Sequence, residues 1–129
     1  MSTIINGSSP SITFSDSTTQ STAGLTSSST QVCQAWVNFN GVTTATIRAS
    51  YNVSSVTYVT TGVYTINFTN ALVDANYAAV VGGGNTSGNG GYIRTNYSTT
   101  TSSSLKLVTV NASASAFLDF DYVSVAVFR

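Results

Sequence analysis

The sequence predicts an all-β protein, an antiparallel β-sandwich or small barrel, and two observations lead to that prediction. The 129 residues include 15 Val, 21 Thr, 7 Tyr and 6 Phe, which fill pleated sheets, but only 5 Leu, 1 Lys and no Glu, so strong helix formers are scarce. From Trp36 onward, apolar residues recur with a period of two, in short runs separated by turn-forming residues. About eight such strands, roughly 8 to 12 residues apart, are typical of sandwiches and small barrels.

Two hairpins are expected first. Residues 36–40 (WVNFN) form one strand, and Asn40-Gly41 is a dipeptide that accepts positive φ at both positions of a tight turn. The second arm, 45–53 (ATIRASYNV), alternates without interruption, which predicts one face made of Ala45, Ile47, Ala49, Tyr51 and Val53. A second hairpin is predicted from the strands 55–59 and 63–68, joined by Thr60-Thr61-Gly62.

Four further strands complete the predicted sandwich. The run 77–82 (YAAVVG) is continuously apolar, which is typical of a strand covered on both faces. The remaining strands are expected at 92–97, 105–111 and 121–128, with loops at 82–91 and 98–104 between them.

Residues 1–30 differ from the rest and form a separate segment. Eighteen of these 30 positions are Ser, Thr or Asn, so the segment cannot bury enough apolar surface to offset its own ordering entropy. We therefore expect an extended Ser/Thr-rich segment that is buried against other chains, followed by a β-rich domain, residues 31–129. Its expected assembly contacts are its apolar residues Ile4, Ile5, Ile12, Phe14 and Leu25.

The composition argues against most classes of chemistry. The chain has no His, no Glu, four acidic residues and one cysteine, Cys33, so it lacks the ligands for a closed transition-metal site and the usual groups for acid–base catalysis. We expect no enzyme, no cofactor and no metal. With four basic residues and zero net charge, few groups can neutralise phosphates, so nucleic acid is a poor candidate partner. No signal peptide or apolar run of membrane-spanning length is visible, so no membrane partner is expected.

Asp119 and Asp121 form the one pair of carboxylates close in sequence. Two residues apart on a strand, they would face the same side and could hold a hard cation. The simpler reading, which we favour, is that these charges keep a strand edge from pairing with other chains.

A glycine-rich loop is the candidate recognition site. The sequence GGGNTSGNGG at 82–91 lacks the motif of a phosphate-binding loop. It is typical of a mobile surface loop, and binding sites are often built on such loops. The amide and aromatic side chains at or beside it suit a neutral hydrogen-bonding and stacking surface for sugars. The candidate receptor-facing residues are Asn85, Asn89, Tyr92 and Arg94.

Three stretches of sequence carry a resemblance to a known family. Residues 4–24 (IINGSSPSITFSDSTTQSTAG) resemble an element of bacteriophage tail-fibre and other virion proteins that lies near a trimer axis. Residues 35–80, with the elements AWVNFNG, IRASYNVSS, YTINFT and DANY, resemble the distal knob of phage tail fibres, and the ending SVAVFR resembles the last strand of such heads. The resemblance implies a β-rich, homotrimeric protein at the surface of a virus particle, involved in attachment, and it carries over no catalytic residue. It also implies that residues 1–30 are an anchoring and trimerisation segment and that residues 31–129 are a β-sandwich knob.

Two functions of different class stay open. In the first, the trimer is a tail-fibre-like tip that attaches to a host-surface glycan or protein. In the second, it is a capsid decoration (cement) protein that stabilises the particle. In both, the protein is assembled in the host cytoplasm and resides on the virion surface, and residues 1–30 bind other virion proteins of the capsid or tail.

Overall fold

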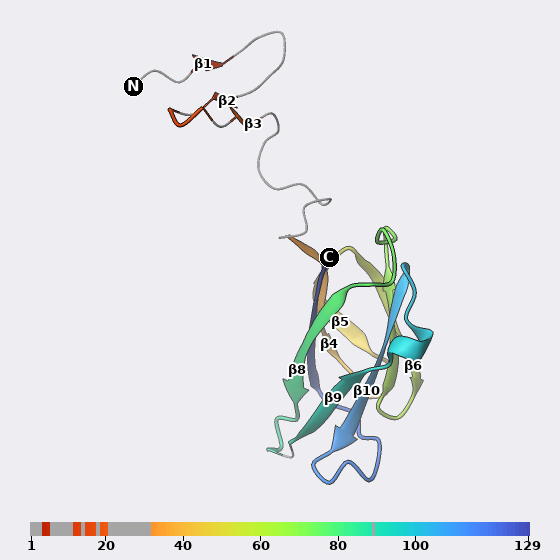
Figure 1. The fold of residues 1–129 in the computed structure, drawn as a ribbon. Coiled ribbons are helices and arrows are strands. Elements are labelled where there is room, and N and C mark those ends of the chain that lie inside the picture. The colour runs from red at the N-terminus through yellow and green to blue at the C-terminus, as the bar shows by residue number, and fades with distance from the viewer. Residues whose placement is uncertain (1–3, 6–11, 14, 18, 21–31, 89) are drawn as a thin grey trace. The chain divides into compact units, whose positions relative to one another are not determined.

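A computed structural model describes residues 4–5, 12–13, 15–17, 19–20, 32–88 and 90–129 (Figure 1). The chain divides into two compact parts, Met1–Val32 and Cys33–Arg129, two residues beyond the predicted boundary. In the first part, the two-residue strands β1 (Ile4–Ile5), β2 (Ile12–Thr13) and β3 (Thr19–Gln20) pair antiparallel in the order β1-β2-β3.

The second part, the knob, is built from two four-stranded antiparallel sheets packed face to face (Figure 1). One sheet has the order β5-β4-β11-β8 and the other β6-β7-β10-β9. The prediction of an all-β sandwich is confirmed, and the sheets do not close into a barrel. The elements are β4 (Cys33–Asn40), β5 (Thr46–Tyr51), β6 (Val53–Thr60), β7 (Val63–Phe68), β8 (Ala78–Gly84), β9 (Gly91–Thr95), the 3-10 helix η1 (Tyr97–Thr99), β10 (Ser104–Asn111) and β11 (Tyr122–Phe128).

The core lies between the two sheets and follows the period-two pattern. Phe39 from β4, Tyr64 from β7 and Phe120 from the segment before β11 are fully buried, and the rings of Phe39 and Tyr64 meet edge to face with centroids 5.2 Å apart. Such aromatic pairs add about 0.5–1.5 kcal/mol beyond the burial of apolar area. Cys33 is half-buried, and its thiol donates to the Ala35 carbonyl at 3.3 Å.

The first hairpin forms between β4 and β5, but its predicted turn is wrong. Neither Asn40 nor Gly41 has positive φ, and the left-handed residues are Thr43 and Ala45. Gly41 is needed for another reason. A Cβ at this position would lie 2.5 Å from the Tyr64 hydroxyl oxygen and 2.8 Å from the Phe120 carbonyl oxygen.

The uninterrupted alternation predicted for 45–53 is also wrong. The β4–β5 register pairs Asn38 with Ala49 but Phe39 with Ile47, so Arg48 is an extra, bulged residue. Because the bulge shifts the alternation by one position, Ala49 and Tyr51 lie on the outer face of the sheet while Ile47 packs against the core.

Asn52 lies between β5 and β6, at the point where the chain passes from one sheet to the other. Its φ of 53° is left-handed, a conformation that asparagine tolerates better than most residues. Its side-chain amide donates to the carbonyls of Gln34 (3.0 Å) and Asn70 (3.1 Å), and its side-chain oxygen accepts from the Asn70 N–H at 2.8 Å. This corner therefore ties together the ends of β4, β5 and β7.

The second hairpin is confirmed, with Gly62 at φ 63° in the turn between β6 and β7. The prediction that both faces of 77–82 are covered is wrong, because β8 is the edge strand of its sheet and Val80 is 63% exposed. The strand also extends through Gly84, which shortens the predicted loop at 82–91.

Candidate functional site

The outward face of the β6-β7-β10-β9 sheet carries two cations and two exposed aromatic rings. Tyr92 and Arg94 alternate outward on β9, while Ile93 between them packs against the core. Lys106 points outward from β10, since its neighbours Leu105 and Leu107 are fully buried. Phe117 lies in the loop that follows β10. We call Tyr92, Arg94, Lys106 and Phe117 the basic aromatic face.

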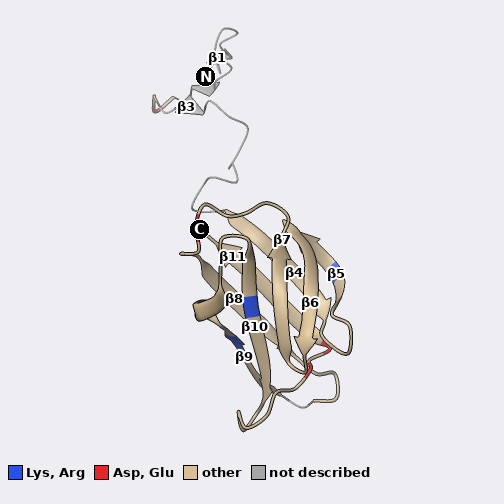
Figure 2. Ribbon diagram, turned by 90° about the vertical axis from the view of Figure 1, so that its right-hand side faces the viewer, with Lys and Arg blue, Asp and Glu red and all other residues tan. Residues whose placement is uncertain are grey.

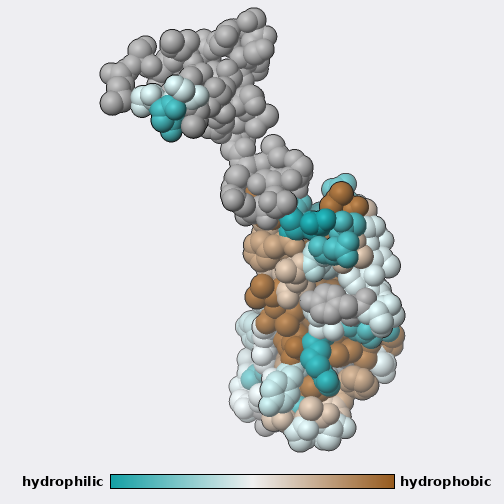
Figure 3. All heavy atoms as spheres, in the orientation of Figure 1, coloured by the Kyte–Doolittle hydropathy of each residue, from teal (hydrophilic) through white to brown (hydrophobic). Residues whose placement is uncertain are grey.

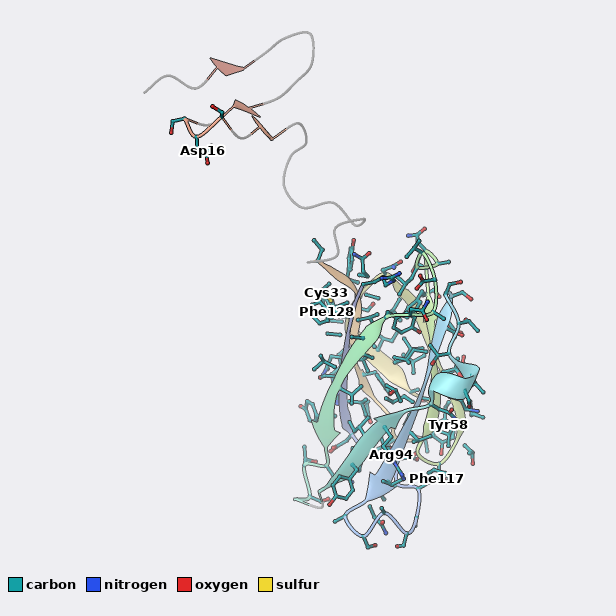
Figure 4. All side chains as sticks on the ribbon, in the orientation of Figure 1. Asp16, Cys33, Tyr58, Arg94, Phe117 and Phe128 are labelled. Carbon is teal, nitrogen blue, oxygen red and sulfur yellow. The ribbon has the colours of Figure 1, made fainter. Side chains whose placement is uncertain are left out.

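Strand register places these four residues along one stretch of β10, from Lys106 to Val110, which is about 13 Å long. Arg94 pairs with Val108, the next outward residue along β10 from Lys106. Tyr92 pairs with Val110 from one side and Phe117 bridges to Val110 from the other, so the two rings flank one buried valine. Directly opposed residues lie about 4.5–5.5 Å apart at Cβ, and diagonal neighbours about 7–8 Å apart. Figure 4 labels Arg94 and Phe117, which lie in the lower part of the knob in that view.

The position of Phe117 is held by backbone pairing. Its neighbour Leu118 donates its N–H to the Thr109 carbonyl at 3.1 Å, and the buried Thr109 hydroxyl donates back to the Leu118 carbonyl at 2.5 Å. Tyr92 is 57% exposed and Phe117 53% exposed. Two large rings on a fixed sheet form a preorganised contact surface.

The predicted receptor-facing residues only partly lie together. Tyr92 and Arg94 share the basic aromatic face, but Asn85 does not belong to it. The Asn85 side-chain oxygen accepts the Asp121 N–H at 3.0 Å, so this residue fastens its loop to the segment before β11. Asn89 lies outside the described residues.

Lys106 and Phe117 were missed by the sequence analysis. The alternation of LKLVTVN already places Lys106 on the face opposite Leu105 and Leu107. Phe117 is an isolated aromatic residue in a Ser- and Ala-rich loop, and only the tertiary structure brings it beside Val110.

The outward face of the β5-β4-β11-β8 sheet carries an apolar cluster beside the hydrogen-bonded polar pair Asn38 and Ser124. The cluster consists of Trp36, Tyr51, Val80, Ala126 and Phe128, which we call the apolar face. Trp36 pairs with both Tyr51 and Ala126, and Ala126 pairs with Val80. A shallow groove of about 430 Å³ lies on this face, and its lining includes Trp36, Asn38, Val80, Gly82, Ser124 and Ala126. Brown, hydrophobic residues gather over β8 in Figure 3.

Beside this groove, the edge of β8 lacks the features that protect the other three edges. The β5 edge carries the Arg48 bulge, the β6 edge has two register shifts, and the short β9 edge carries Arg94. β8 pairs with β11 over seven consecutive positions without a shift, and it contains no charge and no proline. An exposed, uncharged edge of this kind is prone to pairing with another strand.

Arg48 is the single charged residue on the outward face of this sheet among the residues the structure describes. Its guanidinium donates to the Asp121 carbonyl at 2.6 Å and lies 4.1 Å from the centroid of the Tyr122 ring. These contacts hold the cation at the margin of the apolar face.

Asp119 and Asp121 do not act as a pair, and the prediction of a strand edge carrying both charges is wrong. Both precede β11, and each fastens a different turn. Asp119 accepts from the Gly62 N–H (2.6 Å), the Tyr64 hydroxyl (2.9 Å) and the Tyr58 hydroxyl (3.1 Å). No group of three His, Cys, Asp or Glu side chains that could hold a metal ion occurs among the described residues.

Asp121 accepts from the N–H of Thr86 at 3.0 and 3.1 Å and from the Thr86 hydroxyl. The hydroxyl hydrogen bond is the main cause that lowers the pKa of Asp121 below its ordinary value. For Tyr64, burial followed by the hydrogen bond to Asp119 raises the pKa of the phenol. Both carboxylates thus stabilise the end of the knob where these turns lie.

The predicted assembly residues can be placed only in part. The backbones of Ile4, Ile5 and Ile12 belong to β1 and β2, but their side chains are outside the described part of the structure. Phe14 and Leu25 lie outside the described residues altogether.

No family model matches the chain, and neither the curated proteins nor the solved structures contain a significant match. Within the described ranges, no helix has the length and apolar character needed to cross a membrane.

Proposed function

We propose that the protein is a non-enzymatic, homotrimeric structural protein of a bacteriophage particle, whose knob attaches to the host surface. The observation that carries the proposal is the contrast between the two outward faces of the knob. The apolar face has the chemistry of a surface that other protein chains cover. The basic aromatic face has the chemistry of a surface that recognises a ligand.

The division of the chain supports a separate role for the N-terminal part. Residues 1–32 and 33–129 are compact by themselves, which suits an anchoring segment joined to a display domain. Three copies held together would present three knobs at once. Linking weak sites in this way increases avidity without any new contact.

The apolar groove beside the unprotected β8 edge favours one other candidate, a capsid decoration protein. In that role the groove and the edge would be covered by capsid subunits, and the particle would lose stability without the protein.

Copy number and location on purified particles distinguish the two functions. Quantitative protein stoichiometry with labelled-antibody imaging is expected to give a few tens of copies or fewer, at the tail. Hundreds of copies over the shell would instead establish the decoration protein, and absence from particles would refute both.

A truncation tests the anchoring segment. Deleting residues 1–30 is expected to leave a folded knob, measured by circular dichroism, that no longer joins the particle. Incorporation of the truncated protein at the level of the full chain would contradict the proposal.

A further inference from the structure

The basic residues of the knob differ in whether their charged side chains have a partner within the protein. Arg129 makes a bidentate ion pair with Asp74, with its Nε 3.0 Å and its second guanidinium nitrogen 2.6 Å from the two carboxylate oxygens. Arg48 is held by the Asp121 carbonyl and the Tyr122 ring.

By contrast, the side chains of Arg94 and Lys106 have no hydrogen-bond or ion-pair partner in the described part of the chain.

The carboxylates of the knob lie away from these two cations. Asp74 is paired with Arg129, while Asp119 and Asp121 are occupied by the turns near Gly62 and Thr86. In Figure 2 the blue residues on β9 and β10 lie on the sheet, whereas the red residues lie toward the ends of the knob. The outward face of the β6-β7-β10-β9 sheet is therefore positive, although the whole chain has zero net charge.

The surroundings of these cations are neutral and rich in hydrogen-bonding groups. Thr65 on β7 pairs directly with Lys106, and Asn67 pairs with Ser104. The Asn96 N–H donates to the Lys106 carbonyl at 2.8 Å, which continues the same sheet beyond β9. Hydroxyl and amide side chains can donate to and accept from sugar hydroxyls.

We propose that the basic aromatic face binds an acidic polysaccharide. Its carboxylate or phosphate groups bind Arg94 and Lys106, and its sugar rings lie on Tyr92 and Phe117. The inference rests on the proposed attachment function and specifies its ligand class. A neutral glycan would leave both cations without a partner, whereas a nucleic acid would call for a longer run of cations than these two.

The test is direct binding of the purified full-length protein to sensors coated with one of three polymers. Polygalacturonate supplies carboxylates on sugar rings, phosphorylated dextran supplies phosphates on sugar rings, and unmodified dextran is neutral. We expect binding to one or both acidic polymers that weakens with added salt, and none to unmodified dextran. Comparing the two acidic polymers identifies which anion the face prefers.

Charge-removing variants locate the site. Arg94→Gln and Lys106→Gln are each expected to weaken binding about tenfold or more, because each removes a charge-assisted hydrogen bond. Arg48→Gln is the matched control, since it removes the same charge from the other sheet, and it is expected to bind within about twofold of the unchanged protein. Tyr92→Ser and Phe117→Ser are expected to weaken binding with no change in the circular dichroism spectrum.

Several outcomes would overturn the inference. They are binding to neither acidic polymer, equal binding to unmodified dextran, equal weakening by Arg48→Gln and Arg94→Gln, or tighter binding to single-stranded DNA than to either polysaccharide. A competition assay separates this inference from the attachment function. Purified protein that blocks particle adsorption to host cells but binds neither acidic polymer would preserve attachment and refute the ligand class. Binding to an acidic polymer through Arg94, without any block of adsorption, would refute attachment instead.

Discussion

The hydroxyl of Tyr64 donates a 2.9 Å hydrogen bond to the carboxylate of Asp119, a residue 55 positions away in the sequence. The same carboxylate oxygen accepts the Gly62 N–H at 2.6 Å. This contact joins the β6–β7 turn to the segment that precedes β11, so it fastens one sheet to the chain that enters the other.

Replacing Asp119 tests this contact. Asp119→Ala leaves the Gly62 N–H without its acceptor and removes the acceptor of two tyrosine hydroxyls, so it is expected to lower the free energy of unfolding by about 2–3 kcal/mol. Tyr64→Phe should cost about 1 kcal/mol. Urea denaturation of both variants and of the double variant measures the coupling. Fully additive losses would show that the two side chains do not interact.

Asn52 offers a test of the corner between the two sheets. Asn52→Gly removes the side-chain hydrogen bonds but accepts positive φ, whereas Asn52→Ala removes the same bonds and also strains the backbone. We expect Asn52→Ala to be less stable than Asn52→Gly by about 1 kcal/mol, measured by thermal denaturation. Equal stability of the two variants would mean that the left-handed conformation contributes nothing.

Acidification should destabilise the knob through Asp74 and Asp121. The hydrogen bond from Arg129 lowers the pKa of Asp74, and the hydrogen bond from Thr86 lowers the pKa of Asp121. A carboxyl group whose pKa is lower in the folded state stabilises the fold above its unfolded pKa, which is about 3.9 for Asp, and this stabilisation is lost as the pH falls through the folded value. The melting temperature is therefore expected to drop below about pH 4.

Asp74→Asn and Asp121→Asn should each make that drop shallower. A melting temperature that falls equally steeply with pH in both variants would exclude these carboxylates as its cause.

Val80 tests whether other chains cover the apolar face. Val80→Lys places a charge beside the groove and is expected to weaken self-association by about tenfold or more, because covering that face would bury an unpaired charge. Val59→Lys is the matched control, since Val59 is also an exposed valine, 53% accessible, and lies on the other sheet. Sedimentation over a range of concentrations measures both. The same association state for both variants would place the interface elsewhere.

Much of the fold could be predicted because it depends on local patterns. The period-two runs of β4, β7 and β10 set which side chains enter the core, and the Thr60-Thr61-Gly62 turn joins β6 to β7 as expected. The errors arose where a contact distant in sequence overrides local preference. The bulge at Arg48 depends on pairing with β4, and the corner at Asn52 depends on hydrogen bonds to Gln34 and Asn70.

The sequence by itself determined the all-β class, the strand periodicity and the separate character of residues 1–30, because composition and alternation are local properties. The tertiary structure decided which outward residues become neighbours. Arg94, Lys106 and Phe117 come together only because β9 and the loop after β10 pair with opposite sides of β10. The tertiary structure also decided that β8 is an unprotected edge, because strand order depends on pairing between segments far apart in the chain.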